Sequence, residues 1–540
     1  MLRLEHLPAD VLGHSPLARA AYSGRLARAG LALPRGTEEL PPPPPVLDED
    51  ARGELVRALE AGLTPLSPHV AVLDALRTLR EPRACAVVTG QQPGLCGGPL
   101  YSLYKGLHAI RLARRLSQSW ERPVVPIFWN HADDHDVAEV HHLHVLNRNL
   151  DLQKVGLAGM SSGRQMLSRI VLDEERQRLG AIRALLADLL RDTPHGERML
   201  ALLAPRHGES LARAFTRAFT ELLGQHGLVV LEPDWIRAPM TRALARIIEL
   251  EKWSALDEGS RVLRAAGLEP AIEPGQAALL FAIDARGRRA LRRGGEGWKY
   301  DDEEGSRTTT ELVVELQQDR LAWSPGALLR PLVQDLVLPV AAYVGGMGEL
   351  AYHAQLAELR LATGVPATPF VPRVSITLVD GEARQALAKV GATVGDVLRA
   401  RGEFAVEKST EPPPEVLARL RKIAADAARE LGAARDGLAE LDPSLPVLAR
   451  RTIDQVKGSI ESMAEKAERV HQNRSGKGKR HERRLNNALF PRGEPQERVL
   501  GPLLPLARFG EGWLAELLGE LDPFPMEHLV VLLGEDIAVD

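Results

Sequence analysis

The apolar residues between positions 84 and 136 predict a βαβ unit. Ala84–Thr89 is a short apolar run that ends in β-branched residues, as in a buried strand. Apolar side chains then recur at helical spacing over Leu100–Leu116, and a second apolar run covers Val124–Trp129. Strands joined by a helix in this order nearly always pair in parallel through a right-handed crossover. The polar residues that follow both strands should therefore face one crevice at the carboxyl edge of the sheet.

Four more apolar segments extend this pattern. Leu228–Leu231, Pro339–Gly346 and Val371–Val379 each predict a further strand of the same sheet. Ala278–Asp284 and Arg288–Arg293 flank a short turn and predict a small β-hairpin. We interpret the arginines of this hairpin as a solvated face, with contact to a phosphate as the alternative.

Helical patterns dominate both ends of the chain. Residues 1–83 are predicted to be helical around the proline run at 41–45. At 416–441, and again at 453–470, apolar positions step by three and four, which predicts an antiparallel coiled-coil hairpin. The basic run 477–484 continues this arm. We interpret it as a solvated helix face, with contact to an anionic ligand as the alternative.

Together these elements predict an α/β fold: a Rossmann-like parallel sheet core with two inserted connecting segments and an antiparallel coiled-coil helical arm. Near the C-terminus, Leu529–Leu533 is predicted to be an edge strand or a buried tail. The expected order is core at 1–150, a mostly helical insertion at 151–215, core at 216–250, a second insertion with a small mixed or β element at 251–322, core at 323–382, the arm at 383–490, and a segment packing on the core at 491–540.

Composition narrows the class of protein. The 540 residues are 44% hydrophobic, which is enough for a sizeable core. A net charge of −4 gives no general attraction to nucleic acid or to a membrane surface, so neither is an expected partner. Two cysteines fit a reducing compartment without a disulfide framework. Without a signal-peptide core or an apolar run of about 18 residues, we expect a cytoplasmic protein.

The loop after the first strand is rich in glycine. Residues 90–99 contain four glycines and two prolines. Glycine lets a ligand approach the backbone, and a helix N-terminus offers free N–H groups to an anion. The spacing matches neither a P-loop nor a G-x-G-x-x-G motif. A phosphate or carboxylate site and a simple tight turn both remain open on this pattern.

A histidine-rich stretch follows the second strand. His131, His135, His141, His142 and His144 fall within fourteen residues, next to the carboxylates of residues 133–136. Metal ligation is chemically feasible for this set, while a hydrogen-bonded strand end is the alternative. We expect no stoichiometric metal here.

Several motifs together resemble the cysteine ligases of bacillithiol biosynthesis, the BshC family. The resemblance runs from about residue 85 to the C-terminus. The chain departs from the family pattern at Cys96, at Val137, where the family has phenylalanine, and at His131, where it has no histidine. Because Cys96 replaces an aromatic residue, it is not proposed as a nucleophile. The motifs are Val88–Leu95, Gly98–Tyr101, Tyr104–Lys105, Asp134–Asp136, Ser324–Pro325, Arg330–Leu332, Gly345–Tyr352, Val371–Thr377 and Ala488–Arg498.

The resemblance implies the last step of bacillithiol synthesis. L-Cysteine would be joined by an amide bond to the glucosamine amine of glucosaminyl-malate. Amide formation from a free carboxylate is uphill in water, so ATP or a related nucleotide is the expected activator. No metal site is expected apart from magnesium accompanying the nucleotide.

The resemblance and the crevice together give a set of candidate site residues. Asp134, His135 and Asp136 would orient the amine or take its proton, with Glu349 as a further catalytic candidate. Lys105 would neutralise a phosphate or carboxylate. The other predicted binding residues are Gly90, Gln91, Gln92, Gly94, Tyr104, Gly345, Gly346, Tyr352, Arg373 and Ser375.

Two other functions remain open on the sequence. One is a metal-dependent hydrolase that uses the cluster His131–His144. The other is a nucleotide-binding coiled-coil scaffold without catalysis. Whichever function applies, the ligase included, the exposed apolar positions of the arm predict a homodimer through residues 385–490.

Overall fold

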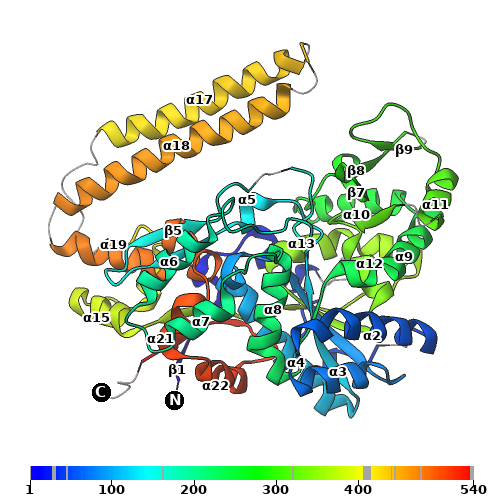
Figure 1. The fold of residues 1–540 in the computed structure, drawn as a ribbon, viewed down its shortest axis with the longest axis horizontal. Helices are drawn as coiled ribbons and strands as arrows, with labels where there is room; N and C mark the ends of the chain where they lie inside the picture. Colours follow the sequence, from blue (N-terminus) through cyan, green and yellow to red (C-terminus); the bar gives the residue numbers. More distant parts are fainter. Residues whose placement is uncertain are drawn as a thin grey trace. The chain divides into compact units, whose positions relative to one another are not determined.

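A five-stranded parallel sheet forms the centre of the larger of two units in this computed structural model (Figure 1). Its strands are β2 (Cys85–Gln91), β3 (Val124–Asn130), β6 (Val229–Leu231), β11 (Val340–Gly345) and β12 (Phe370–Pro372), in the order β12-β11-β2-β3-β6. All neighbours pair in parallel, and α4 (Leu100–Trp120) connects β2 to β3. The predicted βαβ unit and parallel Rossmann-like core are confirmed.

Both faces of this sheet are covered, which explains the unbroken apolar runs of its strands. Val87 packs on one face against Leu112 and Leu116 of α4. Its neighbours Ala86 and Val88 point to the other face and join a larger cluster with helices and the inserted sheet. Alternation along the strand thus buries every position from Cys85 to Gly90.

The larger unit, residues 1–380 with 494–540, contains most of the helices. Its other α-helices are α1 (Pro16–Tyr22), α2 (Glu49–Leu63), α3 (Val70–Leu79), α5 (Val137–Val140), α6 (Leu179–Leu190), α7 (Gly196–Leu203), α8 (Leu211–Leu223), α9 (Arg237–Glu249), α10 (Ser254–Ala265), α11 (Thr309–Gln317), α12 (Arg330–Val337), α13 (Met347–Gln355), α14 (Ala357–Thr363), α20 (Gln496–Val499), α21 (Leu503–Phe509) and α22 (Gly512–Glu520).

The second inserted segment builds a four-stranded antiparallel sheet. Its order is β10-β7-β8-β9, from β7 (Ala278–Asp284), β8 (Gly287–Gly294), β9 (Gly297–Tyr300) and β10 (Ala322–Pro325). The predicted hairpin is confirmed as β7 and β8. A short antiparallel pair, β4 (His142–Leu146) and β5 (Leu152–Gly156), spans the expected boundary between the core and the first insertion.

The interpretation of the hairpin arginines as a solvated face is wrong for two of them. Arg288 and Arg289 are only 5% and 3% exposed. The Arg288 guanidinium stacks 3.6 Å from the centre of the Phe281 ring. Arg289 forms ion pairs with Asp302 and Glu303. Its charge is therefore balanced by carboxylates of the protein, whereas the sequence pattern predicted that water would solvate it.

A separate three-stranded sheet corrects three further predictions. Its order is β1-β14-β13, from β1 (Arg3–Pro8), β13 (Ser375–Val379) and β14 (Glu527–Leu532). The N-terminal region is therefore not entirely helical, and β14 is a central rather than an edge strand. The predicted strand Val371–Val379 is divided between two sheets, since Pro372 has no N–H to continue the ladder of β12. These pairings join chain ends that lie far apart in sequence, which local patterns do not reveal.

The second unit, residues 381–493, is helical. Its α-helices are α15 (Gly381–Val390), α16 (Val394–Arg399), α17 (Glu415–Ala439), α18 (Leu445–Arg474) and α19 (Lys477–Leu489). Near the start of α17, Arg421 pairs with Glu468 near the end of α18 at 2.7 Å, so the two long helices run antiparallel. The predicted coiled-coil hairpin is confirmed, and the basic run belongs to the separate helix α19.

The structure describes residues 2–26, 32–43, 47–160, 163–295, 297–318, 321–405, 415–439, 441–442, 445–474 and 477–534. The end of the proline run, Pro44 and Pro45, therefore lies outside the described residues. No helix in these ranges is long and apolar enough to span a membrane.

Candidate active site

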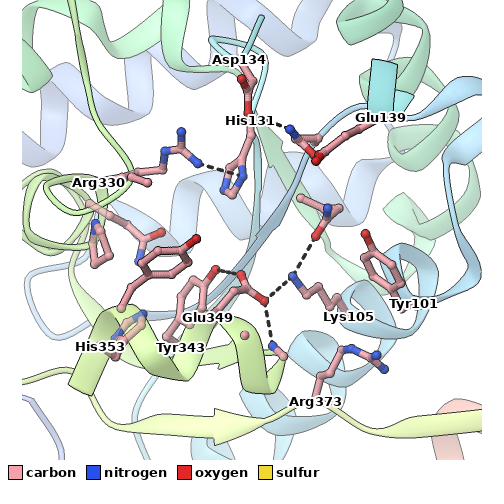
Figure 2. Close-up of a pocket in the computed structure, with 18 of the residues that line it drawn as sticks. Tyr101, Lys105, His131, Asp134, Glu139, Arg330, Tyr343, Glu349, His353 and Arg373 are labelled. Carbon is pink, nitrogen blue, oxygen red and sulfur yellow. Dashed lines mark hydrogen bonds and ion pairs between the residues drawn. The ribbon is translucent and has the colours of Figure 1, made fainter. Parts of the chain in front are cut away.

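A cavity of about 400 Å³ opens at the carboxyl edge of the parallel sheet (Figure 2). Gln91 ends β2, and His131 directly follows β3. Lys105 projects from α4 and Glu349 from α13, the helices that follow β2 and β11. This is the crevice that the order of strands and helices predicted.

The glycines of the loop after β2 shape the cavity without lining it. A Cβ added to Gly94 would lie 2.4 Å from the Cα of Gly98, so the loop closes tightly on itself. Gly98 has a φ of 70°, a conformation that favours glycine. The N–H of Leu100, at the start of α4, donates to the carbonyl of Leu500. From the end of β2 and this loop, the side chains that reach the cavity are Gln91 and Gln92.

An ion pair between Lys105 and Glu349 occupies the centre of the site (Figure 2). The Lys105 side chain is 2% exposed, and its Nζ lies 2.7 Å from Glu349 Oε2. The same ammonium donates to the carbonyl of Gly90 and to Gln91 Oε1. With these three contacts, all three ammonium protons of Lys105 are engaged within the protein. Burial lowers the pKa of Lys105 more than the Glu349 carboxylate raises it.

The Glu349 carboxylate is equally occupied. Its Oε1 accepts a hydrogen bond from the Tyr343 hydroxyl at 2.6 Å, and its Oε2 accepts from the Gly346 N–H at 2.7 Å. The latter contact is the capping interaction that starts α13. Glu349 thus fixes the helix start and the lysine at the same time.

Three guanidinium groups line the cavity. Arg373 is paired with the buried Glu497 at 2.6 Å. Arg330 donates to His131 Nδ1 at 3.1 Å, and Arg498 is exposed. Within the described parts of the chain, neither Arg330 nor Arg498 forms an ion pair, so both are free to meet an anion.

The neighbouring Arg330 fixes the state of His131. A guanidinium can only donate, so Nδ1 accepts and a neutral ring carries its proton on Nε2. Burial, followed by the charges of Arg330 and Lys105, lowers the pKa of His131 well below its usual value. The ring therefore stays neutral near pH 7.

Two carboxylates occupy the wall beyond His131. Asp134 accepts from Gln92 Nε2 at 2.7 Å and from the N–H of His135 at 2.7 Å. Burial alone would raise the pKa of Asp134, but the charges of Arg330 and Arg288 and these hydrogen bonds hold it below its usual value. Glu139 lies nearby on α5, and burial followed by the charge of Asp136 raises its pKa.

The structure brings many of the predicted site residues to this cavity but not all. The lining includes Gln91, Gln92, Lys105, Asp134, Gly346, Glu349, Tyr352 and Arg373. Gly90 and Gly94 contribute only backbone, and Tyr104 is buried behind the wall. Gly345 and Ser375 face an adjoining cavity of about 500 Å³, which also contacts Arg373 and Arg498.

His135 and Asp136 do not line the cavity. His135 Nδ1 lies 3.3 Å from the guanidinium of Arg288, on the side of the inserted sheet. Asp136 caps the start of α5 by accepting from the N–H of Ala138. The turn at Asp134 separates these neighbours, so a catalytic role for either stays a prediction.

The five histidines between positions 131 and 144 lie in three separate surroundings. His131 contacts Arg330, His135 contacts Arg288, and the rings of His141, His142 and His144 lie against one another on the β4 side. Among the described residues, no three histidine, cysteine, aspartate or glutamate side chains are grouped as metal ligands. The geometry therefore offers no support for the metal-dependent hydrolase.

Seven polar side chains of the lining had no role assigned from the sequence. They are Tyr101, Glu139, Arg330, Gln334, Tyr343, His353 and Arg498. Three of them, Tyr101, Arg330 and Arg498, belong to the sequence motifs shared with the BshC family. Membership in these motifs could have identified them as candidate site residues. Glu139 and Tyr343 lie only a few residues from such motifs.

Comparison with known proteins identifies two family models that together cover most of the chain. Residues 46–374 match the model described as "Bacillithiol biosynthesis BshC, N-terminal Rossmann-like domain". Residues 376–533 match "Bacillithiol biosynthesis BshC, C-terminal coiled-coil domain". The first match covers the strands of the parallel core, and the second covers the coiled-coil arm together with most of β13, with β14 and with α20–α22 of the larger unit.

Curated relatives give the same result over nearly full lengths. Three that carry the name "Putative cysteine ligase BshC" illustrate the similarity. The protein from Koribacter versatilis is 29% identical, over 97% of this chain and 96% of its own. Those from Geobacillus thermodenitrificans and Solibacter usitatus are 31% and 30% identical, over 89% and 90% of this chain and 90% of each relative.

Proposed function

This chain belongs to the bacillithiol biosynthesis BshC family, and on that premise we propose that it is a cysteine ligase acting on glucosaminyl-malate. It would join the carboxyl group of L-cysteine to the glucosamine amine through an amide bond. The observation that carries this proposal is the cavity at the sheet edge. It presents two guanidinium groups, Arg330 and Arg498, together with the carboxylates of Asp134 and Glu139. Such a lining suits a ligand that bears both anionic groups and an amine.

We further propose that ATP or a related nucleotide, with its magnesium, activates the cysteine carboxylate. Amide formation from a free carboxylate is uphill in water, so the reaction needs a coupled activator. The residues present fit an anionic partner, because guanidinium groups bind phosphate and carboxylate oxygens in a two-pronged geometry. Arg330 and Arg498 would hold such oxygens, since the protons of Lys105 are already engaged.

In this proposal the remaining lining residues position the reactants. Asp134, whose pKa is held low, stays ionised and would attract the ammonium form of the amine. Gln91 and Gln92 would orient carbonyl or phosphate oxygens, although both already contact neighbouring side chains. The Lys105–Glu349 pair would keep the centre of the site rigid, with Tyr352, Gly346 and Arg373 closing it.

Turnover by the purified full-length protein tests the proposal. L-Cysteine, glucosaminyl-malate, ATP and magnesium should yield the amide and a nucleotide product in equal amounts, measured by mass spectrometry. Omitting either cysteine or the nucleotide should abolish both products. Nucleotide consumption without amide, or no reaction with any nucleoside triphosphate, would overturn it.

We also propose that the protein acts as a homodimer in the cytoplasm. Exposed apolar residues occur along the coiled-coil hairpin, including Val447, Leu448 and Met463, at 59%, 60% and 56% exposure. A second copy would cover these side chains. The free, buried cysteines Cys85 and Cys96 are in keeping with a reducing compartment.

A further inference from the structure

The proposed reaction needs a group that accepts a proton from the amine. A sugar amine arrives largely as an ammonium ion, which has no lone pair with which to attack a carboxyl carbon. The acceptor must reach the cavity and have a free lone pair, and its affinity for protons should not be strongly suppressed. The carboxylates and histidines in or beside the cavity are His131, Asp134, His135, Asp136, Glu139, Glu349 and His353. His353 is a poor base, because its ring packs against Tyr343 and Phe370 and burial lowers its pKa to about 3.

The two most central carboxylates are poor candidates. Glu349 already accepts from Lys105, Tyr343 and Gly346, so both of its oxygens are occupied. Asp134 accepts from Gln92 and from two backbone N–H groups. The surrounding arginine charges also lower its pKa, which weakens it as a base.

The histidines and Asp136 are excluded by position or by tautomer. His131 receives the Arg330 donor on Nδ1, so its other nitrogen carries a proton and cannot accept one. His135 lies outside the cavity lining, with Nδ1 against Arg288. Asp136 is also outside the lining and caps α5.

We propose that Glu139 accepts the amine proton in the amide-forming step; this inference rests on the proposed function. Figure 2 shows Glu139 on the cavity wall between Asp134 and Tyr101. Among the residues that the structure describes, Glu139 forms no ion pair, and the side-chain amide of Gln92 lies beside it as a hydrogen-bond donor. Its carboxylate therefore has lone pairs available to a ligand.

The charges around Glu139 favour proton uptake. Asp134 and Asp136 face it from the preceding turn, and Tyr101 faces it as a neutral phenol from α4. Glu139 is an exposed residue, and partial burial of its carboxylate, then the charges of Asp136 and Asp134, raise its pKa, while the Gln92 hydrogen bond opposes this shift. A carboxylate in such surroundings is a stronger base than Asp134.

The step balances as follows. Glu139 takes one proton from the ammonium group and leaves a neutral amine. The amine lone pair forms the C–N bond to the carboxyl carbon of phosphate-activated cysteine, and the C–O bond to the phosphate breaks. The second proton leaves the nitrogen with the departing phosphate, and Glu139 returns its own proton to water.

Glu139→Gln tests this assignment because it keeps the size and hydrogen-bonding capacity of the side chain while removing the base. We expect kcat to fall by about 10²–10⁴-fold, with a much smaller change in the KM for glucosaminyl-malate. The defect should narrow as pH rises toward the pKa of the amine, because the substrate then arrives already neutral. A merely structural role would lower the melting temperature without this pH dependence. Glu304→Gln, at an exposed position away from the cavity, is the matched control.

The outcomes separate this inference from the proposed function. A folded Glu139→Gln protein with wild-type kcat would overturn the role of Glu139 and leave the ligase intact. An equal defect at every pH would also overturn it. A wild-type protein that forms no amide would overturn the proposed function, and the role of Glu139 with it.

Discussion

The Lys105–Glu349 pair predicts an unequal response to removal of its two partners. Glu349→Gln leaves the Lys105 ammonium, 2% exposed, without a carboxylate. Removing one partner of a buried pair costs about 3–5 kcal/mol, because the other charge stays buried and uncompensated. We therefore expect Glu349→Gln to lower the free energy of unfolding by about 3 kcal/mol or more.

Lys105→Met should cost less. The Glu349 side chain is 25% exposed, so water can solvate the carboxylate that remains. It also keeps its hydrogen bonds from Tyr343 and Gly346. The loss is then mainly that of the lysine hydrogen bonds to Gly90 and Gln91, about 1–3 kcal/mol.

The double variant tests the pairing most directly, because both partners are removed together. Lys105→Met combined with Glu349→Gln removes both charges of the pair, so neither residue is left as an uncompensated charge. We therefore expect the double variant to be more stable than Glu349→Gln alone, which corresponds to a coupling of about 1–3 kcal/mol between the two sites.

The stability deficit of Glu349→Gln should depend on pH. The pKa of Lys105 is already lowered from its ordinary value of 10.5, so the folded state binds this proton less tightly than the unfolded state. Stability contributed by this group accordingly rises with pH until that ordinary value is passed. Without the Glu349 charge the folded pKa falls further, so the deficit should be largest near neutral pH and should shrink as pH rises.

Urea denaturation followed by tryptophan fluorescence measures all three variants, with Trp129 buried in β3 beside the site. The comparison requires equal dependence of the unfolding free energy on urea in each variant. If Lys105→Met proved as costly as Glu349→Gln, or if the double variant were the least stable, the pair would not act as described.

Three further predictions follow from the same structure. Arg330→Met and Arg498→Met should each raise the KM for an anionic substrate by about tenfold or more, with a smaller effect on the melting temperature. His135→Ala should leave turnover per folded molecule near the wild-type value, because its imidazole lies outside the cavity lining; a large loss would restore His135 to the mechanism. Charged residues in place of Ile460 and Met463 should give a monomer by light scattering with the core still folded, whereas an unchanged mass would place any dimer contact elsewhere.

Much of the parallel core could be predicted because its signals are local. β2, α4 and β3 follow one another within 46 residues, and each carries its own periodicity. The three-stranded sheet could not be predicted in this way. β1 pairs with β14 across more than 500 residues, and β1 is at most half-buried, so its pattern is weak.

The sequence predicted which segments of the chain form the site, but it did not predict which of their side chains point into the cavity. Asp134 and His135 are adjacent in sequence, yet only Asp134 lines the cavity. The Asp134 carboxylate accepts from the next two backbone N–H groups, and this local turn directs His135 toward Arg288. Arg288 comes from the inserted sheet, more than 150 residues later, so only the folded chain shows which way the histidine points.

The central ion pair also determines which residues are left to meet a ligand. The Lys105 ammonium donates its three protons to Glu349, Gly90 and Gln91. Both oxygens of the Glu349 carboxylate accept hydrogen bonds from groups of the protein. Neither can change partners without leaving a buried polar group unsatisfied. A ligand must therefore be met by the less constrained groups of the lining. In the proposed reaction Arg330 and Arg498 would bind the anions, and Glu139 would meet the amine beside the charge of Asp134, which is itself held by Gln92 and two backbone N–H groups.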